Sequence, residues 1–436
     1  MSTKKRSHRR GGHPAKLARR RDRNAARSQA AARGPNRLAR PIVRDALGLS
    51  GPLDAELWGS ALMGMLWSRR YALRLENLGS SDYARMFGGP LVEAIGRIGG
   101  TGARIALSVI EAVDDGELGL RAGELAGEVP EDAGHAVPDW IAALGEAEIT
   151  DAAVMRDEVF DDACTVFLEA RHPDGNVHAV GVLVDHNLGG MAKDVMVVDS
   201  IDGVARVMRE HPEPNGALKL ERISPGIAAG RIHAALELTD MTWDPPVSED
   251  YADLRALALM RADETPRLVV ANDRAEMPSA ERDRLRDEFL RSPEGQAFAP
   301  DSDEAYAVSL AIDFCADYVD GRPLRWSPVV VELFMADWIP RKILNDSELF
   351  ARLPSALDAW VRFAGRKSNL PEWAVAATRE AIPAWHETMV ERSEDPAAAG
   401  PAKEFLTAVQ KAGIDLEDRD ALDTFVAGWN ARSVMG

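Results

Sequence analysis

CTVFLEARHPDGNVHAVGVLVDHNLGGMAKDVMVVDS, residues 164–200, contains three runs rich in β-branched and other apolar residues. The first run ends at His172-Pro173-Asp174-Gly175-Asn176. Proline presets φ and Asp-Gly tolerates positive φ, which favours a hairpin turn. The runs at 178–185 and 194–200 follow, and the loop between them is short enough for an antiparallel return. The stretch therefore predicts a three-stranded antiparallel meander.

The second run of this meander is apolar on both faces. Val180, Val182 and Val184 alternate with Ala179 and Leu183. A strand that is apolar on both faces is usually covered on both. We therefore expect at least two of the three strands to lie in the middle of a sheet, with helices packed against it.

The sequence on either side of the meander supplies those helices. Apolar residues recur at helical spacing before residue 148 and after residue 225, and residues 217–224 alternate like a further strand or an edge strand. This pattern predicts an α+β fold: a small antiparallel β-meander flanked by helices, with a large all-helical C-terminal half. The expected segments are a disordered basic arm (1–40), a helical N-terminal segment (41–147), an antiparallel β region (148–224) and a helical C-terminal region, separate or packed with the rest (225–436).

Composition indicates a packed body. Apolar residues make up 46% of the 436 residues, and ten of the residues are Trp. Cys164 and Cys315 each lie within an apolar pattern, which is typical of buried free thiols in a reducing compartment. No apolar run approaches the ~18 residues of a membrane span, and no apolar segment of a secretory signal follows the basic N-terminus. We expect a cytoplasmic protein; a transit peptide is the minor alternative.

Charge is divided sharply along the chain. Residues 1–40 contain 14 Lys or Arg and one acid, a net charge of +13, whereas the remainder carries −31. Such asymmetry suggests that the arm meets an anion, either nucleic acid, a membrane surface or the acidic body itself. The arm has no aromatic residue, so nucleic-acid contact would be directed at phosphates. The residues predicted to bind the polyanion are Lys4, Lys5, Arg6, Arg9, Arg10, Arg19, Arg20 and Arg21.

One loop of the meander offers candidate chemistry. Asp185 ends one predicted strand and Asp194 begins the next, so their side chains are expected ~5 Å apart across the hairpin. Two carboxylates so close require a proton or a cation between them. His186 and Lys193 are the nearest candidate partners. The functional hypothesis is a metal- or acid/base-dependent, hydrolase-like site; the competing interpretation is a polar loop whose residues serve turn geometry.

Other candidate features favour a structural interpretation. His172 and His178 flank the first turn and are predicted to be an exposed surface pair. The common catalytic, nucleotide and metal motifs are absent from the sequence, so it identifies no cofactor or metal. The favoured function is non-catalytic binding or scaffolding, with the basic arm on a polyanion. The alternatives are the hydrolase-like enzyme and an arm that folds onto the acidic body of its own or a neighbouring chain. Oligomeric state is not indicated.

Overall fold

A computed structural model describes residues 35–72, 84–130, 136–268, 277–414, 419 and 424–426. These residues divide into two compact units. Unit 1 contains the described residues up to Arg156, Cys164–Val184, and those of Met191–Val270. Unit 2 contains Asp157–Ala163, Asp185–Gly190 and the described residues from 277 onward. The units thus divide near residue 270, within the segment 225–436 that the sequence treats as one helical region.

Unit 1 is built around a five-stranded antiparallel sheet, ordered β4-β3-β2-β1-β5. The sheet confirms the α+β prediction and the meander, and the alternating segment near 220 forms the edge strand β5. β1 and β2 pair with an irregularity between Ile149 and Asp151. The strands are β1 (Glu148–Asp157), β2 (Ala163–Arg171), β3 (Val177–Asp185), β4 (Met191–Val198) and β5 (Leu218–Arg222).

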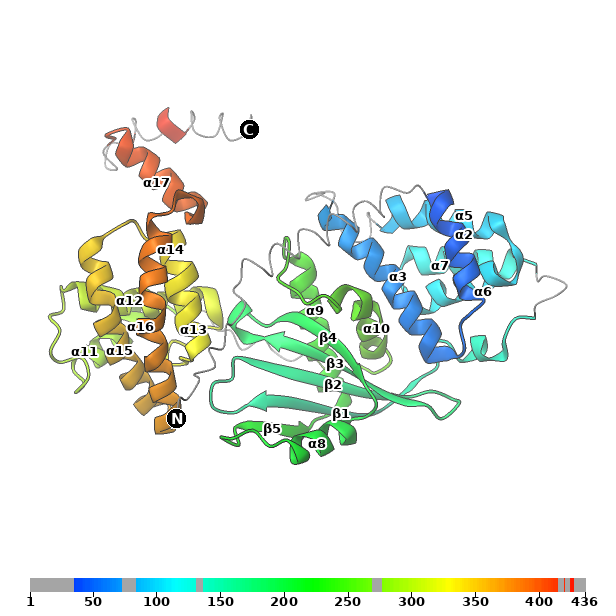
Figure 1. The fold of residues 1–436 in the computed structure, drawn as a ribbon, viewed down its shortest axis with the longest axis horizontal. Coiled ribbons are helices and arrows are strands. Elements are labelled where there is room, and N and C mark those ends of the chain that lie inside the picture. Colours follow the sequence, from blue (N-terminus) through cyan, green and yellow to red (C-terminus); the bar gives the residue numbers. More distant parts are fainter. Residues whose placement is uncertain are drawn as a thin grey trace, which may run out of the picture. The chain divides into compact units, whose positions relative to one another are not determined.

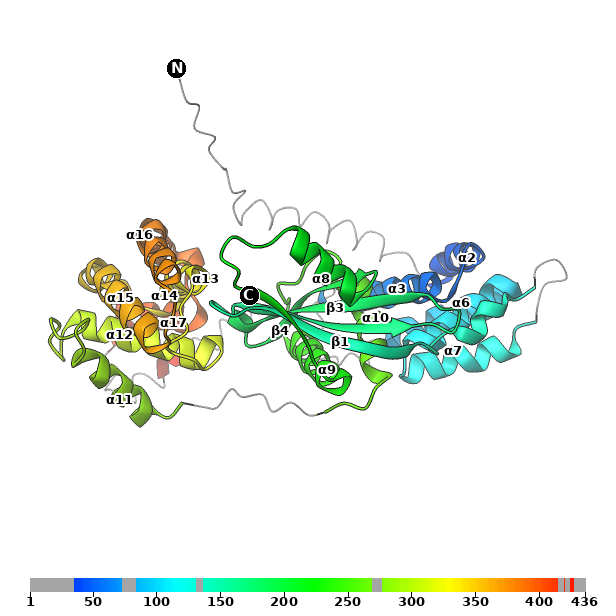
Figure 2. The ribbon, with the colours of Figure 1, turned by 90° about the horizontal axis from the view of Figure 1, so that it is seen from below.

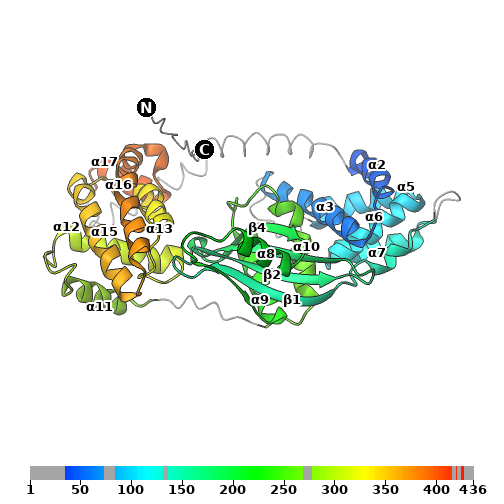
Figure 3. The same cartoon turned by 60° about the horizontal axis from the view of Figure 1, so that its bottom comes forward.

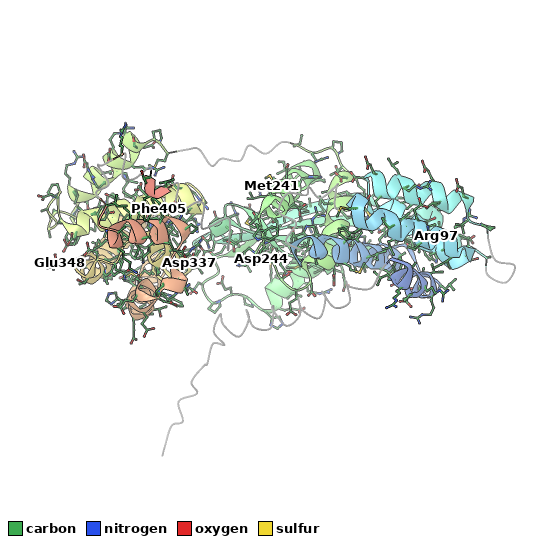
Figure 4. All side chains as sticks on the ribbon, turned by 90° about the horizontal axis from the view of Figure 1, so that it is seen from above. Arg97, Met241, Asp244, Asp337, Glu348 and Phe405 are labelled. Carbon is green, nitrogen blue, oxygen red and sulfur yellow. The ribbon has the colours of Figure 1, made fainter. Side chains whose placement is uncertain are left out.

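Helices cover both faces of this sheet, as its apolar strands predict. α9 and α10 bury one face together with Val166, Val180 and Val182, while α8 lies on the opposite face over a smaller cluster around Phe167 (Figures 1 and 2). Met241, the last residue of α9 and labelled in Figure 4, is 71% exposed. The three helices are α8 (Ile201–Glu210), α9 (Pro225–Met241) and α10 (Tyr251–Asp263).

The N-terminal helices form a second core within unit 1. The predicted disordered arm extends too far, because residues 35–40 already belong to α2 and Ala39 in that helix is fully buried. Burial of apolar surface against the neighbouring helices offsets the conformational entropy that these residues lose when they become ordered. The elements are α2 (Pro35–Ala46), α3 (Pro52–Ala72), the π-helical turn η1 (Ala84–Gly88), α5 (Gly89–Ile98), α6 (Gly100–Val113), α7 (Glu117–Glu128) and the 3-10 turn η2 (Asp139–Ala143).

α3 and α10 cross at very close range. A Cβ atom on Gly64 would overlap the backbone carbonyl of Ala252, so only glycine permits this approach. Nearby, the hydroxyl of Ser60 accepts a hydrogen bond from the amide of Leu257 at 3.0 Å. The crossing brings polar residues of the two helices together, among them Glu56 of α3 and Arg261 of α10.

Unit 2 consists of helices (Figure 3). They enclose an aromatic core that includes Phe289, Trp326 and Trp360. None of the described helices combines the length and apolar character needed to span a membrane. The elements are the 3-10 turn η3 (His186–Leu188), α11 (Ser279–Leu290), α12 (Asp303–Phe314), η4 (Cys315–Val319), α13 (Pro328–Glu332), η5 (Leu333–Trp338), α14 (Ile339–Lys342), α15 (Ser347–Lys367), α16 (Glu372–Glu394), η6 (Pro396–Ala398) and α17 (Pro401–Lys411).

Candidate functional site

The turn after Asp185 is shorter than the sequence suggests. β3 ends at Asp185, and the amide of Gly190 donates to the Asp185 carbonyl at 3.0 Å, so β4 begins at Met191. The Asp185 side chain is buried and accepts a hydrogen bond from the amide of Asn187 at 2.9 Å. Asp185 thus caps the 3-10 turn that starts at His186.

Asp194 does not face Asp185 as predicted. It is the fourth residue of β4 rather than the first, which places it ~10 Å further along the strand at ~3.3 Å per residue. Its carboxylate accepts hydrogen bonds from the amide of Val195 and the hydroxyl of Ser248, while the amide of Ser248 donates to the carbonyl of Lys193. β4 is an edge strand, so these contacts cover main-chain groups that would otherwise be open to strand pairing. The hydrolase-like hypothesis required two facing carboxylates, and the strand bounds separate them.

His186 contacts a different acid, Asp161, within unit 2. Nδ1 of His186 lies 2.8 Å from the Asp161 carbonyl and 3.4 Å from its Oδ1. Arg322 reaches Oδ2 of the same carboxylate at 2.6 Å. Burial alone would raise the pKa of Asp161, but the hydrogen bonds from His186 and Arg322 outweigh it and lower the pKa to about 2. Asp161 is therefore ionised, with Oδ2 hydrogen bonded to Arg322, while Oδ1 lies within ion-pair distance of His186 without a hydrogen-bond partner among the described residues.

Arg325 is the centre of this part of unit 2. Its guanidinium donates to Asp320 at 2.6 Å, to Asp162 at 2.9 Å and to the side-chain carbonyl of Asn187 at 2.6 Å. Asp162 also accepts from the hydroxyl of Ser327, the N-cap of α13, at 2.7 Å. Burial raises the pKa of Asp162, although these donors oppose the rise. We call Arg325, its three side-chain partners and Ser327 the Arg325 cluster; its geometry is that of a structural joint between loops.

Unit 1 contains a second polar cluster, which the sequence patterns did not predict. Arg261 on α10 has a fully buried side chain. It donates through Nε to Nε2 of His178 at 3.0 Å and through Nη1 to Glu264 at 2.6 Å. Nη2 contacts Glu56 of α3 and lies 3.2 Å from Nε2 of His172. We call Arg261 and these four partners the Arg261 cluster.

The two histidines of this cluster correct a prediction, because neither lies on the surface. Each is 2% exposed, and their rings stack with centroids 5.3 Å apart. Nε2 of His178 accepts from Arg261, so the ring is neutral and carries its proton on Nδ1. Burial, followed by the charge of Arg261, lowers the pKa of His178 to about 3. Within the described structure, Nδ1 of each ring is buried without a hydrogen-bond partner.

The two carboxylates of the Arg261 cluster differ in environment. Glu56 accepts from the amide of Gly145 at 3.0 Å and contacts both Arg261 and His172. Burial opposes its ionisation, yet the His172 hydrogen bond and the Arg261 charge lower the pKa of Glu56 overall. At Glu264 burial prevails and raises the pKa to about 7. Oε2 of Glu264 is buried, and no described residue hydrogen bonds to it.

A sequence signal for the Arg261 cluster existed. Arg261 falls on the same helical face as Leu254, Leu257 and Ala258, where an apolar residue is expected. A charge at a core position of a helix requires a buried partner. The identity of that partner was not readable, since Glu56 and Arg261 are 205 positions apart.

The remaining predicted site residues are less informative. Among the described residues, no group of three or more His, Cys, Asp or Glu side chains is arranged to hold a metal ion. The predicted polyanion-binding residues lie outside the described residues; they are Lys4, Lys5, Arg6, Arg9, Arg10, Arg19, Arg20 and Arg21.

Compared with protein-family models, curated proteins and solved structures, the chain matches none of them.

Proposed function

We propose that this chain is a non-catalytic binding protein whose basic N-terminal segment contacts a polyanion such as nucleic acid. The observation that carries the proposal is the division of charge. Residues 1–40 have a net charge of +13 and the remainder −31. A segment so basic attracts a polyanion, whereas a body so acidic repels one.

Ion pairing within the folded units supports this division of roles. Arg366 binds both oxygens of Glu294 at 2.8 and 2.9 Å, and Arg282 reaches Asp317 at 2.8 Å. Arg121 likewise donates to Glu93 at 2.7 Å. Cations that already have carboxylate partners attract phosphate weakly, because the pair is close to neutral. The 14 cations of residues 1–40 have only Asp22 as an acid within their own segment.

The composition of the segment defines the class of partner. Residues 1–40 contain no aromatic side chain on which bases could stack. Binding through Lys and Arg alone reads the phosphate backbone and releases counterions, so affinity falls steeply with salt. We therefore expect similar affinities for double-stranded oligonucleotides of unrelated sequence.

The test compares the full chain with a deletion of residues 1–34. The deletion stops at residue 34 because α2 starts at Pro35 and Ala39 is buried in the N-terminal core. Fluorescence anisotropy with a labelled DNA duplex should show binding by the full chain at ~50 mM salt and a loss of roughly 10³-fold or more at ~200 mM. The deletion should abolish binding, because it removes the charge while the described fold stays intact.

Charge variants separate electrostatics from chain length. Replacing the eight predicted residues, from Lys4 to Arg21, by Gln should weaken binding strongly but less than the deletion, because Lys16, Arg23, Arg27 and Arg33 remain. Arg37 and Arg40 are exposed on the ordered helix α2, so their double replacement by Gln is a matched control with a much smaller loss. Absence of duplex binding by the full chain at low salt would overturn the proposal, as would unchanged binding after the deletion.

The acidic body is the competing polyanion. α16 carries exposed carboxylates at helical spacing: Glu380, Glu387, Glu391 and Glu394. A synthetic peptide of residues 1–34, titrated into the deleted chain, measures that competition directly. If this peptide binds the body more tightly than it binds DNA, the intramolecular interpretation replaces the proposed one.

A further inference from the structure

We propose that the Arg261 cluster is a pH-sensitive clasp, in which Glu264 gains or loses a proton near neutral pH and thereby controls how firmly the end of α10 is held. The proposal concerns unit 1 alone and is independent of the polyanion function. It assigns a regulatory role to buried groups that the basic segment does not use.

The charges of the cluster are unbalanced. Glu56 comes from α3, His172 and His178 from the β2–β3 hairpin, and Arg261 and Glu264 from α10 or its end. One guanidinium therefore faces two carboxylates in a site where Arg261 and Glu56 are fully buried, and His172, 3.3 Å from Glu56, adds a positive charge only when it is protonated. A buried excess of negative charge is costly, and uptake of one proton removes it.

Hydrogen bonding decides which carboxylate takes that proton. Both oxygens of Glu56 are satisfied, Oε1 by Gly145 and Oε2 by Arg261 and His172. Only Oε1 of Glu264 is satisfied, by Arg261. Glu264 is thus the weaker anion of the two, and burial raises its pKa to about 7. His178 does not compete with Glu264 for this proton, because burial and the charge of Arg261 lower the pKa of His178 to about 3.

The position of Glu264 links its charge to the backbone. α10 ends at Asp263, and Glu264 is its C-cap. Four residues later, the amide of Leu268 donates to the carbonyl of Gly226 in the first turn of α9 at 3.0 Å. When Glu264 loses its proton, the second carboxylate charge repels Glu56 across Arg261. We expect this repulsion to favour opening of the segment 264–268, which exposes the Leu268 amide.

Hydrogen exchange of the full chain tests the clasp. Opening constants for peptides that span residues 257–268 are compared between wild type and Glu264→Gln, from pH ~5.5 to ~8.5, after correction for intrinsic exchange. Gln has the shape of the protonated acid but cannot ionise. The ratio of the wild-type to the variant opening constant should rise roughly 30-fold over this range, as expected for a carboxyl shifted from 4.5 to about 7. Histidine contributions that do not depend on the charge of Glu264 cancel in the ratio because both proteins share them.

Asp263→Asn is the matched control. Asp263 is adjacent to Glu264 but pairs outside the cluster, with His233 at 2.9 Å and Arg267 at 3.3 Å. This variant should follow the wild type at every pH. A constant ratio for Glu264→Gln overturns the clasp, and so does equal behaviour of the two variants.

A second measurement needs no variant. In wild-type protein labelled with carboxyl-¹³C glutamate, one glutamate resonance should titrate near pH 7. If no glutamate carboxyl titrates between pH ~6 and ~8, Glu264 does not exchange a proton there and the proposal is wrong. This readout remains valid even if Glu264→Gln reduces the helical circular dichroism signal.

Discussion

The Arg261 cluster of unit 1 and the Arg325 cluster of unit 2 use one arginine in the same way but in different surroundings. Each guanidinium joins segments that are far apart in the sequence. Arg261 is fully buried and its acid partners are Glu56 and Glu264. Arg325 is 8% exposed and donates to carboxylates, to the Asn187 side chain and to a main-chain carbonyl. The first cluster leaves buried atoms without partners in the described structure, and the acceptors of the second are shared among several donors.

This difference shows how surroundings set the response of a carboxyl group. Glu264 and Asp161 each receive hydrogen bonds from arginine, yet their pKa values shift in opposite directions. Burial dominates at Glu264, where a single donor contacts one oxygen. At Asp161 the hydrogen bonds from His186 and Arg322 outweigh burial. At these two acids the balance between burial and hydrogen bonding sets the direction of the shift; at Asp162 burial outweighs even three donors.

The largest effect is expected for Arg261→Met. The change leaves Glu56 and Glu264 buried without their cation, which typically costs about 3–5 kcal/mol in the free energy of unfolding. Urea unfolding, with hydrogen exchange to assign the loss to unit 1, measures it. Arg267→Met, which removes one exposed ion pair on the same part of the chain, should change stability little. Equal effects of the two variants would show that the Arg261 cluster does not hold unit 1 together.

Arg325→Met should cost less, about 2–3 kcal/mol, because its partners retain other donors and lie nearer to solvent. Asp162 keeps the hydroxyl of Ser327 at 2.7 Å and the side-chain amide of Asn187 at 3.0 Å. Exchange protection should fall in residues 157–163 and 185–190, which belong to unit 2. A loss as large as that of Arg261→Met would contradict the ranking by burial.

The two clusters should also differ in the sign of their pH dependence. Asp161 has a lowered pKa, so its contribution is present above the ordinary value of 3.8 and is lost as pH falls toward about 2. Glu264 has a raised pKa, so its contribution is full below 4.5 and is lost as pH rises through about 7. The difference in unfolding free energy between wild type and Asp161→Asn should shrink by about 1–2 kcal/mol in acid. The difference for Glu264→Gln should change instead between pH ~5 and ~8, and the same pH window for both would refute the contrast.

Local sequence patterns predicted the sheet well and the clusters poorly. The runs around Pro173-Asp174-Gly175 specify a hairpin because turn chemistry and alternation act within a few residues. The start of β4 was placed three residues late, since Met191, Ala192 and Lys193 lack strong strand preference. Contacts distant in sequence draw these residues into the strand, such as the hydroxyl of Thr239 on the Ala192 carbonyl at 2.9 Å.

The two clusters were not predicted because their contacts also join residues that are far apart in the sequence. The contribution of Arg261 to stability depends on Glu56, and that of Arg325 depends on Asp162. Each partner lies more than 160 positions away in the sequence. Periodicity can flag a charge at a buried position, but it does not identify the residue that neutralises it. The prediction that His172 and His178 form an exposed pair is wrong because both rings pack against Arg261 of α10, although the turn between them, residues 173–176, is exposed.

Ser248→Ala should have the smallest effect, about 1 kcal/mol, because it removes only the hydroxyl, which donates to Asp194 at the edge of the sheet and accepts from the amide of Tyr251 at 3.2 Å, and leaves the main-chain bond from residue 248 to Lys193. This variant tests whether Asp194 is structural, as its position on β4 indicates. If Asp194 serves to cover the strand edge, Ser248→Ala should increase concentration-dependent self-association, measured by analytical ultracentrifugation, because edge groups become available for pairing. Ser309→Ala, which removes a hydroxyl that bonds within α12 at 3.1 Å, is the control and should leave association unchanged. If the Ser248→Ala protein stays monomeric and has wild-type stability, Asp194 does not serve to cover the strand edge, and a chemical role for its carboxylate is again the better interpretation.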